Sequence, residues 1–129
     1  MRMADFVVRE SISASLVANN KDGVIREMIN NLVKAGYFQG NDPEEVVKAI
    51  MKREMLGSTG IGRGVAIPHA KHLGVDRLIG TVAVSKTGVP FESLDGEPVY
   101  VLVMLISPND RPGIHLRALD NVSRCLRDD

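Results

Sequence analysis

Apolar side chains recur at helical spacing early in the chain. Val24, Met28 and Leu32 follow one another every four positions, with further apolar residues beside them. This spacing places the apolar side chains on one face of a helix. Gly36 comes next and is typical of a helix C-terminus, since glycine readily adopts a left-handed backbone. The pattern therefore predicts an amphipathic helix over residues 21–35.

A second helix is predicted to begin after Asp42. This residue is a suitable N-cap, Pro43 suits the first turn, and Glu45 stands where a capping box has an acidic residue. The predicted buried face consists of Val46, Val47, Ile50, Met51 and Met55. The glycine-rich segment GSTGIGRG, residues 57–64, follows and predicts irregular backbone.

Apolar runs predict the strands. Residues 65–67 and the small-residue run 79–85 are short candidates, and residues 6–8 are a candidate edge strand. Residues 99–106, VYVLVMLI, form a continuous apolar run, as expected of a strand covered on both faces. No helix is evident between residues 85 and 99, so we expect part of the sheet to be antiparallel.

A last helix is predicted over residues 114–127, with Leu116, Leu119, Val122 and Leu126 turned inward. Helices on both sides of buried strands indicate an α/β fold. We expect a three-layer-like sandwich in which a central mixed β-sheet is flanked by helices. The length of 129 residues fits a single domain over residues 1–129.

Composition and charge exclude several classes of protein. Lysine plus arginine and aspartate plus glutamate both number 16, and only 4% of residues are aromatic, which argues against a nucleic-acid binder. Cys125 is the only cysteine, so no disulfide forms within the chain. The N-terminus lacks the apolar core of a signal peptide, and no apolar run is long enough for direct membrane insertion. These features predict a cytoplasmic protein.

The segment GVAIPHAKH, residues 64–72, contains the most informative candidate for chemistry. Pro68 fixes its own φ and favours extended backbone before it, so we expect His69 at the end of a strand beside the glycine-rich segment. A neutral imidazole is a good nucleophile near neutral pH. The alternative is a partly buried histidine packed under the loop.

Further residues are candidates for holding a phosphate. His115, near the start of the last predicted helix, can donate to an anion there, or can be a surface histidine at a helix terminus. Arg53 offers a planar fork for two phosphate oxygens, or is a cation favoured at a helix C-terminus. Ser58 and Thr59 can donate hydroxyl hydrogen bonds, or close a turn.

Other chemistries have weaker support. His69 and His72 form an HxxH pair, but extended backbone directs them to opposite faces and no third ligand is nearby, so no metal site is expected. GSTGIGRG matches neither a Walker A loop nor a dinucleotide fingerprint, so no nucleotide cofactor is expected.

Taken together, these motifs resemble the fructose/mannitol-type enzyme IIA domains of the bacterial phosphotransferase system, including the nitrogen-regulatory branch. The resemblance rests on RE at 53–54, STGIG at 58–62, GVAIPHAK at 64–71, LDGEPV at 94–99 and HL at 115–116. It covers nearly the whole chain in order and implies an α/β sandwich with a mixed sheet. The family usually continues with a further helix beyond the position where this sequence stops, so the sequence is expected either to be truncated or to lack that helix.

The resemblance also implies a function. His69 would take a phosphoryl group from the phosphohistidine of HPr, or of an HPr-like carrier, and pass it to an enzyme IIB domain. His115 corresponds to the family's second active-site histidine, and Arg53 to its active-site arginine. The alternative is a phosphorylation-dependent regulator that controls partner proteins by binding. In this family the choice of sugar lies in the membrane components, so the sequence does not name it.

Overall fold

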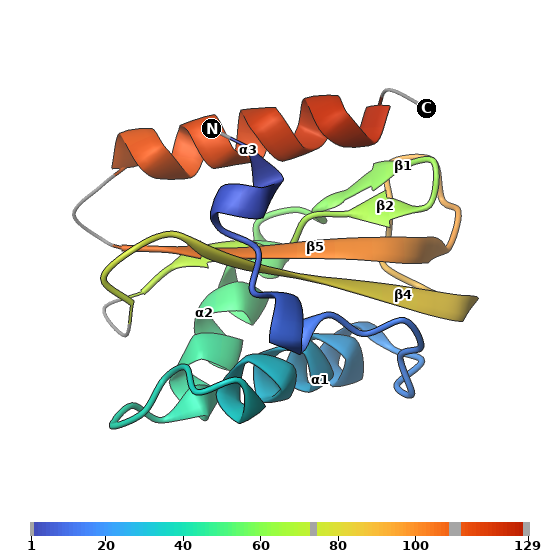
Figure 1. The fold of residues 1–129 in the computed structure, drawn as a ribbon. Helices are drawn as coiled ribbons and strands as arrows, with labels where there is room; N and C mark the ends of the chain where they lie inside the picture. Colours follow the sequence, from blue (N-terminus) through green and yellow to red (C-terminus); the bar gives the residue numbers. More distant parts are fainter. Residues whose placement is uncertain (1, 73–74, 109–111, 128–129) are drawn as a thin grey trace.

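The computed structural model describes residues 2–72, 75–108 and 112–127. The chain forms α1 (Lys21–Lys34), α2 (Pro43–Met55), β1 (Gly60–Gly62), β2 (Val65–Ala66), β3 (His69–Lys71), β4 (Ile79–Val89), β5 (Val99–Ser107) and α3 (Pro112–Arg127), in that order. Two short 3₁₀ helices, Met3–Asp5 and Arg9–Ser11, precede them. The sheet lies between α3 on one face and α1 and α2 on the other (Figure 1). The predicted fold class, a mixed sheet flanked by helices, is confirmed.

Strand β5 is the centre of the sheet. It pairs in parallel with β2 and β3 and antiparallel with β4, so the sheet is mixed. The antiparallel pairing of β4 with β5 was expected from the short connection between them, and β4 runs four residues beyond the predicted end at Ser85. His69 is opposite Leu105 and Lys71 is opposite Ser107, so β3 ends beside the end of β5.

The first two helices begin and end close to the predicted residues, for local reasons. The side chain of Asn20 accepts a hydrogen bond from the Gly23 N–H and caps α1. Gly36 follows α1 with a φ of +100°, which a side chain would disfavour. Asp42 caps α2 by accepting from the N–H of Glu44, at 3.0 Å, rather than through the predicted capping box with Glu45.

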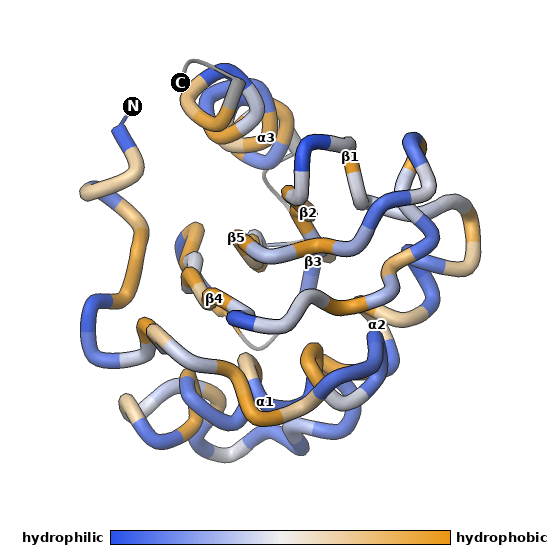
Figure 2. The backbone as a smooth tube through the Cα atoms, turned by 90° about the vertical axis from the view of Figure 1, so that its right-hand side faces the viewer, coloured by the Kyte–Doolittle hydropathy of each residue, from blue (hydrophilic) through white to orange (hydrophobic). Residues whose placement is uncertain are grey.

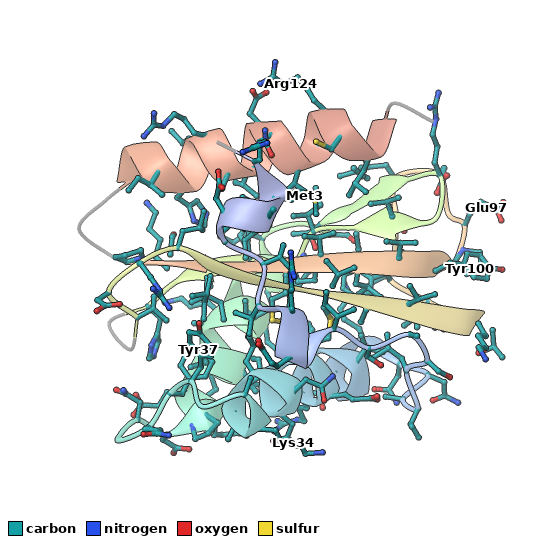
Figure 3. All side chains as sticks on the ribbon, viewed as in Figure 1. Met3, Lys34, Tyr37, Glu97, Tyr100 and Arg124 are labelled. Atoms are coloured by element: carbon teal, nitrogen blue, oxygen red, sulfur yellow. The ribbon has the colours of Figure 1, made fainter. Side chains whose placement is uncertain are left out.

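Two apolar layers hold the molecule together. The larger lies between the sheet and the helices α1 and α2, and the smaller lies between the sheet and α3. Figure 2 shows hydrophobic segments in the strands and on the inner sides of the helices. Side chains fill both layers in Figure 3, where the labelled Lys34 and Arg124 lie on the outer sides of α1 and α3. Burial of β5 on both faces explains its uninterrupted apolar sequence.

Two predictions of local backbone structure were wrong. In residues 6–8, only Val7 makes an isolated bridge, to Gly80, because the flanking residues turn into 3₁₀ helices. The segment 57–64 is not irregular throughout, since β1 pairs antiparallel with β2 within it. A side chain at Gly60 would clash with Ser93, so this strand requires a glycine.

Two residues predicted to face inward are exposed instead. Met55 at the end of α2 is 85% exposed, and Leu116 near the start of α3 is 66% exposed. Their neighbours Glu54 and His115 take the inward positions and are buried. Adjacent residues of a helix point about 100° apart, so only one of each pair faces the sheet.

Candidate active site

Three elements meet at the edge of the sheet where β3 lies. Arg53 comes from the last turn of α2, His69 is the first residue of β3, and His115 lies in the first turn of α3. All three line one cavity of about 570 Å³. The remaining lining residues are Ala49, Lys52, Leu56, Ala70, Lys71, Leu116 and Leu119. The fold thus brings together the three residues that the sequence singled out.

His69 is partly buried, and its ring is held at Nδ1. This nitrogen lies 2.8 Å from the carbonyl oxygen of Ile67, two residues back. A carbonyl only accepts hydrogen bonds, so Nδ1 carries the proton and donates it. In the neutral ring, the lone pair is then on Nε2. His69 begins β3 and does not end the preceding strand, as was predicted, because β2 stops at Ala66. Pro68 fixes the backbone just before it, and the Pro68 carbonyl accepts from the N–H of Leu105 in β5.

Arg53 supports this assignment from the other side of the ring. Its Nε–H donates to Nε2 of His69 at 3.2 Å, which requires that Nε2 be unprotonated. Its Nη1 donates to the carbonyl of Gly57 at 2.8 Å, which anchors the guanidinium to the first residue of the glycine-rich segment. The arginine is therefore more than a favourable cation at a helix C-terminus, because it contacts the candidate nucleophile directly.

His115 is not a surface histidine, which was the alternative left open by the sequence. It is only 7% exposed, and its ring centroid lies 5.2 Å from that of His69, with the two planes tilted by 55°. Its Nδ1 lies 2.5 Å from the hydroxyl oxygen of Ser107, the last residue of β5. The second histidine is therefore adjacent to the first and is held by the sheet.

Both imidazoles are disfavoured in their charged form. Burial lowers the pKa of His69 below its usual value of 6.5. The hydrogen bond to the Ile67 carbonyl opposes this in part, and the smaller effects of Arg53 and Glu54 lower and raise the pKa respectively. Burial lowers the pKa of His115 to about 4, with further contributions from His69, Lys71 and Arg53. Both rings are therefore neutral at physiological pH.

Ser58 and Thr59 lie close to the site, in a smaller cavity that Arg53 and His69 also line. The Ser58 hydroxyl donates to the carbonyl oxygen of Phe91 at 2.5 Å, and the Thr59 hydroxyl donates to the carboxylate of Glu54. Both hydroxyl protons are thus used within the protein, which agrees with the turn-closing alternative. A role for these two residues in binding phosphate stays a prediction.

Sequence reasoning assigned no role to Glu54, although it belongs to the RE motif. Its side chain is 2% exposed and accepts from the N–H and hydroxyl of Thr59. Lys21 of α1 pairs with the same carboxylate at 3.1 Å. The sequence shows only that Glu54 is a carboxylate next to Arg53 and before a glycine-rich segment. This position does not predict that its side chain is buried. Ser107 was also missed, because a serine at the end of an apolar strand gives no signal at all.

His72 lies just after β3, and its backbone N–H donates to the carbonyl of Ser107 at 2.9 Å. Within the described ranges, no group of three histidine, cysteine, aspartate or glutamate side chains is placed to hold a metal ion. Over the same ranges, no helix has the length and apolarity needed to cross a membrane.

The arrangement favours reaction with an electrophile that carries negative charge. It offers one unprotonated imidazole nitrogen at a cavity wall, a guanidinium in contact with that nitrogen, and a second neutral imidazole nearby. No carboxylate lines the larger cavity among the described residues. A phosphoryl group has the charge and the acceptor oxygens that such a site can bind.

Three known proteins are similar to this chain over most of its length. The chain is 35% identical over 128 residues to a nitrogen regulatory protein of Bradyrhizobium diazoefficiens, covering 99% of this chain and 82% of that protein. It is 37% identical over 126 residues to the fructose-specific EIIABC component of Bacillus subtilis, covering 98% of this chain but only 20% of that protein. The crystal structure of IIA-Ntr from Neisseria meningitidis superposes with a TM-score of 0.81 at 29% identity, covering 92% of this chain and 79% of that one.

A family model agrees with these relatives over almost the entire length. The model described as phosphoenolpyruvate-dependent sugar phosphotransferase system, EIIA 2, matches residues 5–129. The resemblance inferred from the STGIG and GVAIPHAK motifs is therefore confirmed, and the chain belongs to the EIIA 2 family of phosphotransferase-system components.

Proposed function

We propose that this chain is a phosphoryl carrier in which Nε2 of His69 is the acceptor. The donor is the phosphohistidine of an HPr-like carrier, and an enzyme IIB domain receives the group afterwards. The observation that carries the proposal is the hydrogen-bond pattern around His69. A carbonyl accepts from Nδ1 and Arg53 donates to Nε2, so the lone pair is on the nitrogen beside the cavity.

The transfer needs no metal or nucleotide. The Nε2 lone pair of His69 attacks the phosphorus in line, a new P–N bond forms, and the donor's P–N bond breaks. The bonding electrons stay on the nitrogen of the donor's imidazole. As the new bond forms, the His69 ring acquires positive charge, which the Ile67 carbonyl stabilises through Nδ1–H at 2.8 Å.

Positioning and charge account for most of the catalysis in such a transfer. In the resting protein the Nε–H of Arg53 occupies the Nε2 lone pair. This N–H must turn aside during attack, and a phosphoryl oxygen then takes its place as acceptor. The second bond of Arg53, to Gly57, keeps the guanidinium near the site during that exchange. His115, whose ring centroid lies 5.2 Å from that of His69, is the second group that we expect to contact the phosphoryl oxygens.

The surface around the cavity is suited to a protein partner. Leu56 and Leu116 line the cavity and are 82% and 66% exposed, and Met55 beside them is 85% exposed. An apolar rim around a shallow reactive centre suits a transient interface with the donor. We place this exchange in the cytoplasm, in agreement with the single cysteine of the chain.

The direct test is to incubate the protein with a phosphorylated HPr-like carrier and to measure its mass. The wild type should gain about 80 Da, the mass of one phosphoryl group, in a form that is labile to acid and stable to base. His69→Ala should gain nothing. His72→Ala is the matched control, three residues away on the same segment, and should gain the full mass. Phosphorylation of His69→Ala would overturn the proposal.

A regulatory role is the second candidate. It is favoured by the 35% identity to a nitrogen regulatory protein, of which this chain covers 82%. Here the same phosphohistidine would act as a mark that changes which protein the chain binds. Affinity capture with wild-type protein, phosphorylated or not, distinguishes the two. Recovery of an enzyme IIB domain supports transport, and recovery of a kinase, channel or transcription factor in only one phosphorylation state supports regulation.

A further inference from the structure

Ser107 stands at the end of β5 with its side chain completely buried. Its hydroxyl oxygen lies 2.5 Å from Nδ1 of His115. Its backbone carbonyl accepts from the N–H of His72, and its strand neighbour in β3 is Lys71. The residue is thus fixed by the sheet on one side and contacts the imidazole on the other.

The direction of the Ser107–His115 bond follows from the need to satisfy the hydroxyl proton. In a buried site a hydroxyl without an acceptor is costly. Among the described residues, Nδ1 of His115 is the acceptor that the Ser107 hydroxyl contacts. If Nδ1 carried the proton instead, the hydroxyl would accept that bond and its own hydrogen would have no partner there. The favoured arrangement is therefore O–H donating to an unprotonated Nδ1.

The charge state of His115 supports the same direction. Burial, followed by smaller effects of His69, Lys71 and Arg53, lowers its pKa to about 4, so one ring nitrogen is unprotonated at neutral pH. With Nδ1 accepting from Ser107, the single proton of the neutral ring is on Nε2.

We propose that Ser107 is a positioning residue that holds His115 in the Nε2–H tautomer, so that this neutral ring donates a hydrogen bond to the phosphoryl group on His69. The hydrogen bond from His115 to the phosphoryl group rests on the proposed function of His69. The tautomer of His115 does not depend on that function. The two adjacent histidines then have opposite tautomers. His69 has its lone pair on Nε2 and acts as nucleophile, whereas His115 has its proton on Nε2 and acts as donor.

This arrangement has an electrostatic advantage over the opposite one. The reversed tautomer would present a lone pair of His115 to phosphoryl oxygens that already carry negative charge. The Nε2–H tautomer presents a donor and adds no net charge beside Arg53 and Lys71. It is also ready before the phosphoryl group arrives, since the buried hydroxyl of Ser107 sets it in the unphosphorylated protein.

Nitrogen-15 NMR of the histidine side chains tests the tautomer without any variant. At pH 7 the wild type should show an unprotonated Nδ1 and a protonated Nε2 for His115. The opposite tautomer, or an even mixture of the two, would overturn the proposal. This outcome is independent of the mass gain on His69, so a failure here is distinguishable from a failure of the proposed function.

Variants at position 107 test whether Ser107 fixes the tautomer of His115. Ser107→Ala removes the donor, so the His115 tautomers should mix and phosphoryl transfer should slow by roughly tenfold, the effect of one lost hydrogen bond. Ser107→Thr keeps the hydroxyl and should restore both the tautomer and the rate. Ser85→Ala is the matched control, because it removes another buried hydroxyl from the sheet and should change neither. A folded Ser107→Ala protein with the wild-type tautomer would show that Ser107 does not fix it.

Discussion

At the scale of single residues, the surroundings of His69 and His115 give two identical side chains different properties. His69 is partly buried, and its Nδ1 and Nε2 contact a carbonyl and a guanidinium. His115 is more deeply buried, and its Nδ1 contacts a hydroxyl. Burial is the largest cause of the lowered pKa of each ring. The lowered pKa of His69 favours the neutral ring that a nucleophile requires.

The lowered pKa of His115 predicts a dependence of stability on pH. In the unfolded chain its pKa is 6.5, and in the folded protein it is about 4, so between these values the unfolded state binds more protons. The stability that depends on neutral His115 is therefore complete above pH 6.5 and is lost as the pH falls toward 4. The loss should amount to about 3 kcal/mol of unfolding free energy.

Urea unfolding at several pH values between 4 and 7.5 measures this effect. Carboxylates also titrate in this range, so the comparison is between the wild type and His115→Gln, which does not titrate at this position. The variant should lose less unfolding free energy than the wild type as the pH falls. Parallel curves for the two proteins would contradict the assigned pKa.

At the scale of elements, a buried carboxylate joins three segments. Glu54 in α2 contacts Lys21 in the first turn of α1 and Thr59 in the glycine-rich segment. Lys21 also lies 4.6 Å from the ring centroid of Phe91, whose carbonyl accepts from Ser58. This network holds the end of α2, which carries Arg53, against the segment that precedes β3.

Replacing Glu54 with alanine should therefore destabilise the protein. The change leaves the ammonium of Lys21, whose side chain is 15% exposed, and the polar groups of Thr59 without their buried partner. We expect the free energy of unfolding to fall by about 3 kcal/mol, as for other broken buried pairs. Urea unfolding measures the change, and Glu45→Ala, at an exposed position of the same helix, should lose less than about 1 kcal/mol. Equal losses of unfolding free energy in the two variants would show that the network around Glu54 does not stabilise the protein.

At the scale of the whole molecule, charge is balanced overall but uneven around the site. Lysine plus arginine equals aspartate plus glutamate, at 16 each. The charged residues among the described ones that line the larger cavity are nonetheless all cationic, namely Lys52, Arg53 and Lys71. A cleft of one sign attracts ligands of the opposite sign and raises their rate of association. The phosphoryl group of the donor carries the matching charge.

Reversing this local charge should slow association with the phosphorylated donor. The double variant Lys52→Glu, Lys71→Glu should reduce the association rate at least tenfold at low salt, and the difference should shrink as salt screens the charges. Stopped-flow measurement over a range of ionic strength tests both points. Lys34→Glu, Lys86→Glu changes the net charge equally at exposed positions outside the cavity lining and should have a much smaller effect. Equal effects of both double variants would exclude local steering.

Much of the fold was predictable because its signals are local. The period of apolar residues and the caps Asp42 and Gly36 gave α1 and α2 within a residue or two. The continuous apolar run of β5 indicated a strand covered on both faces. The edge strand at residues 6–8 and the inward positions of Met55 and Leu116 were wrong, because pairing and helix rotation depend on the neighbouring elements.

The sequence by itself determined which residues carry the candidate chemistry. Its motifs singled out His69, His115 and Arg53, since residue type and local backbone are properties of the chain. Only the tertiary structure decided how these groups work together. The tautomer of His69, the burial of His115 and the contacts of Glu54 and Ser107 each depend on atoms from segments far apart in sequence, whose distances the folded packing alone sets.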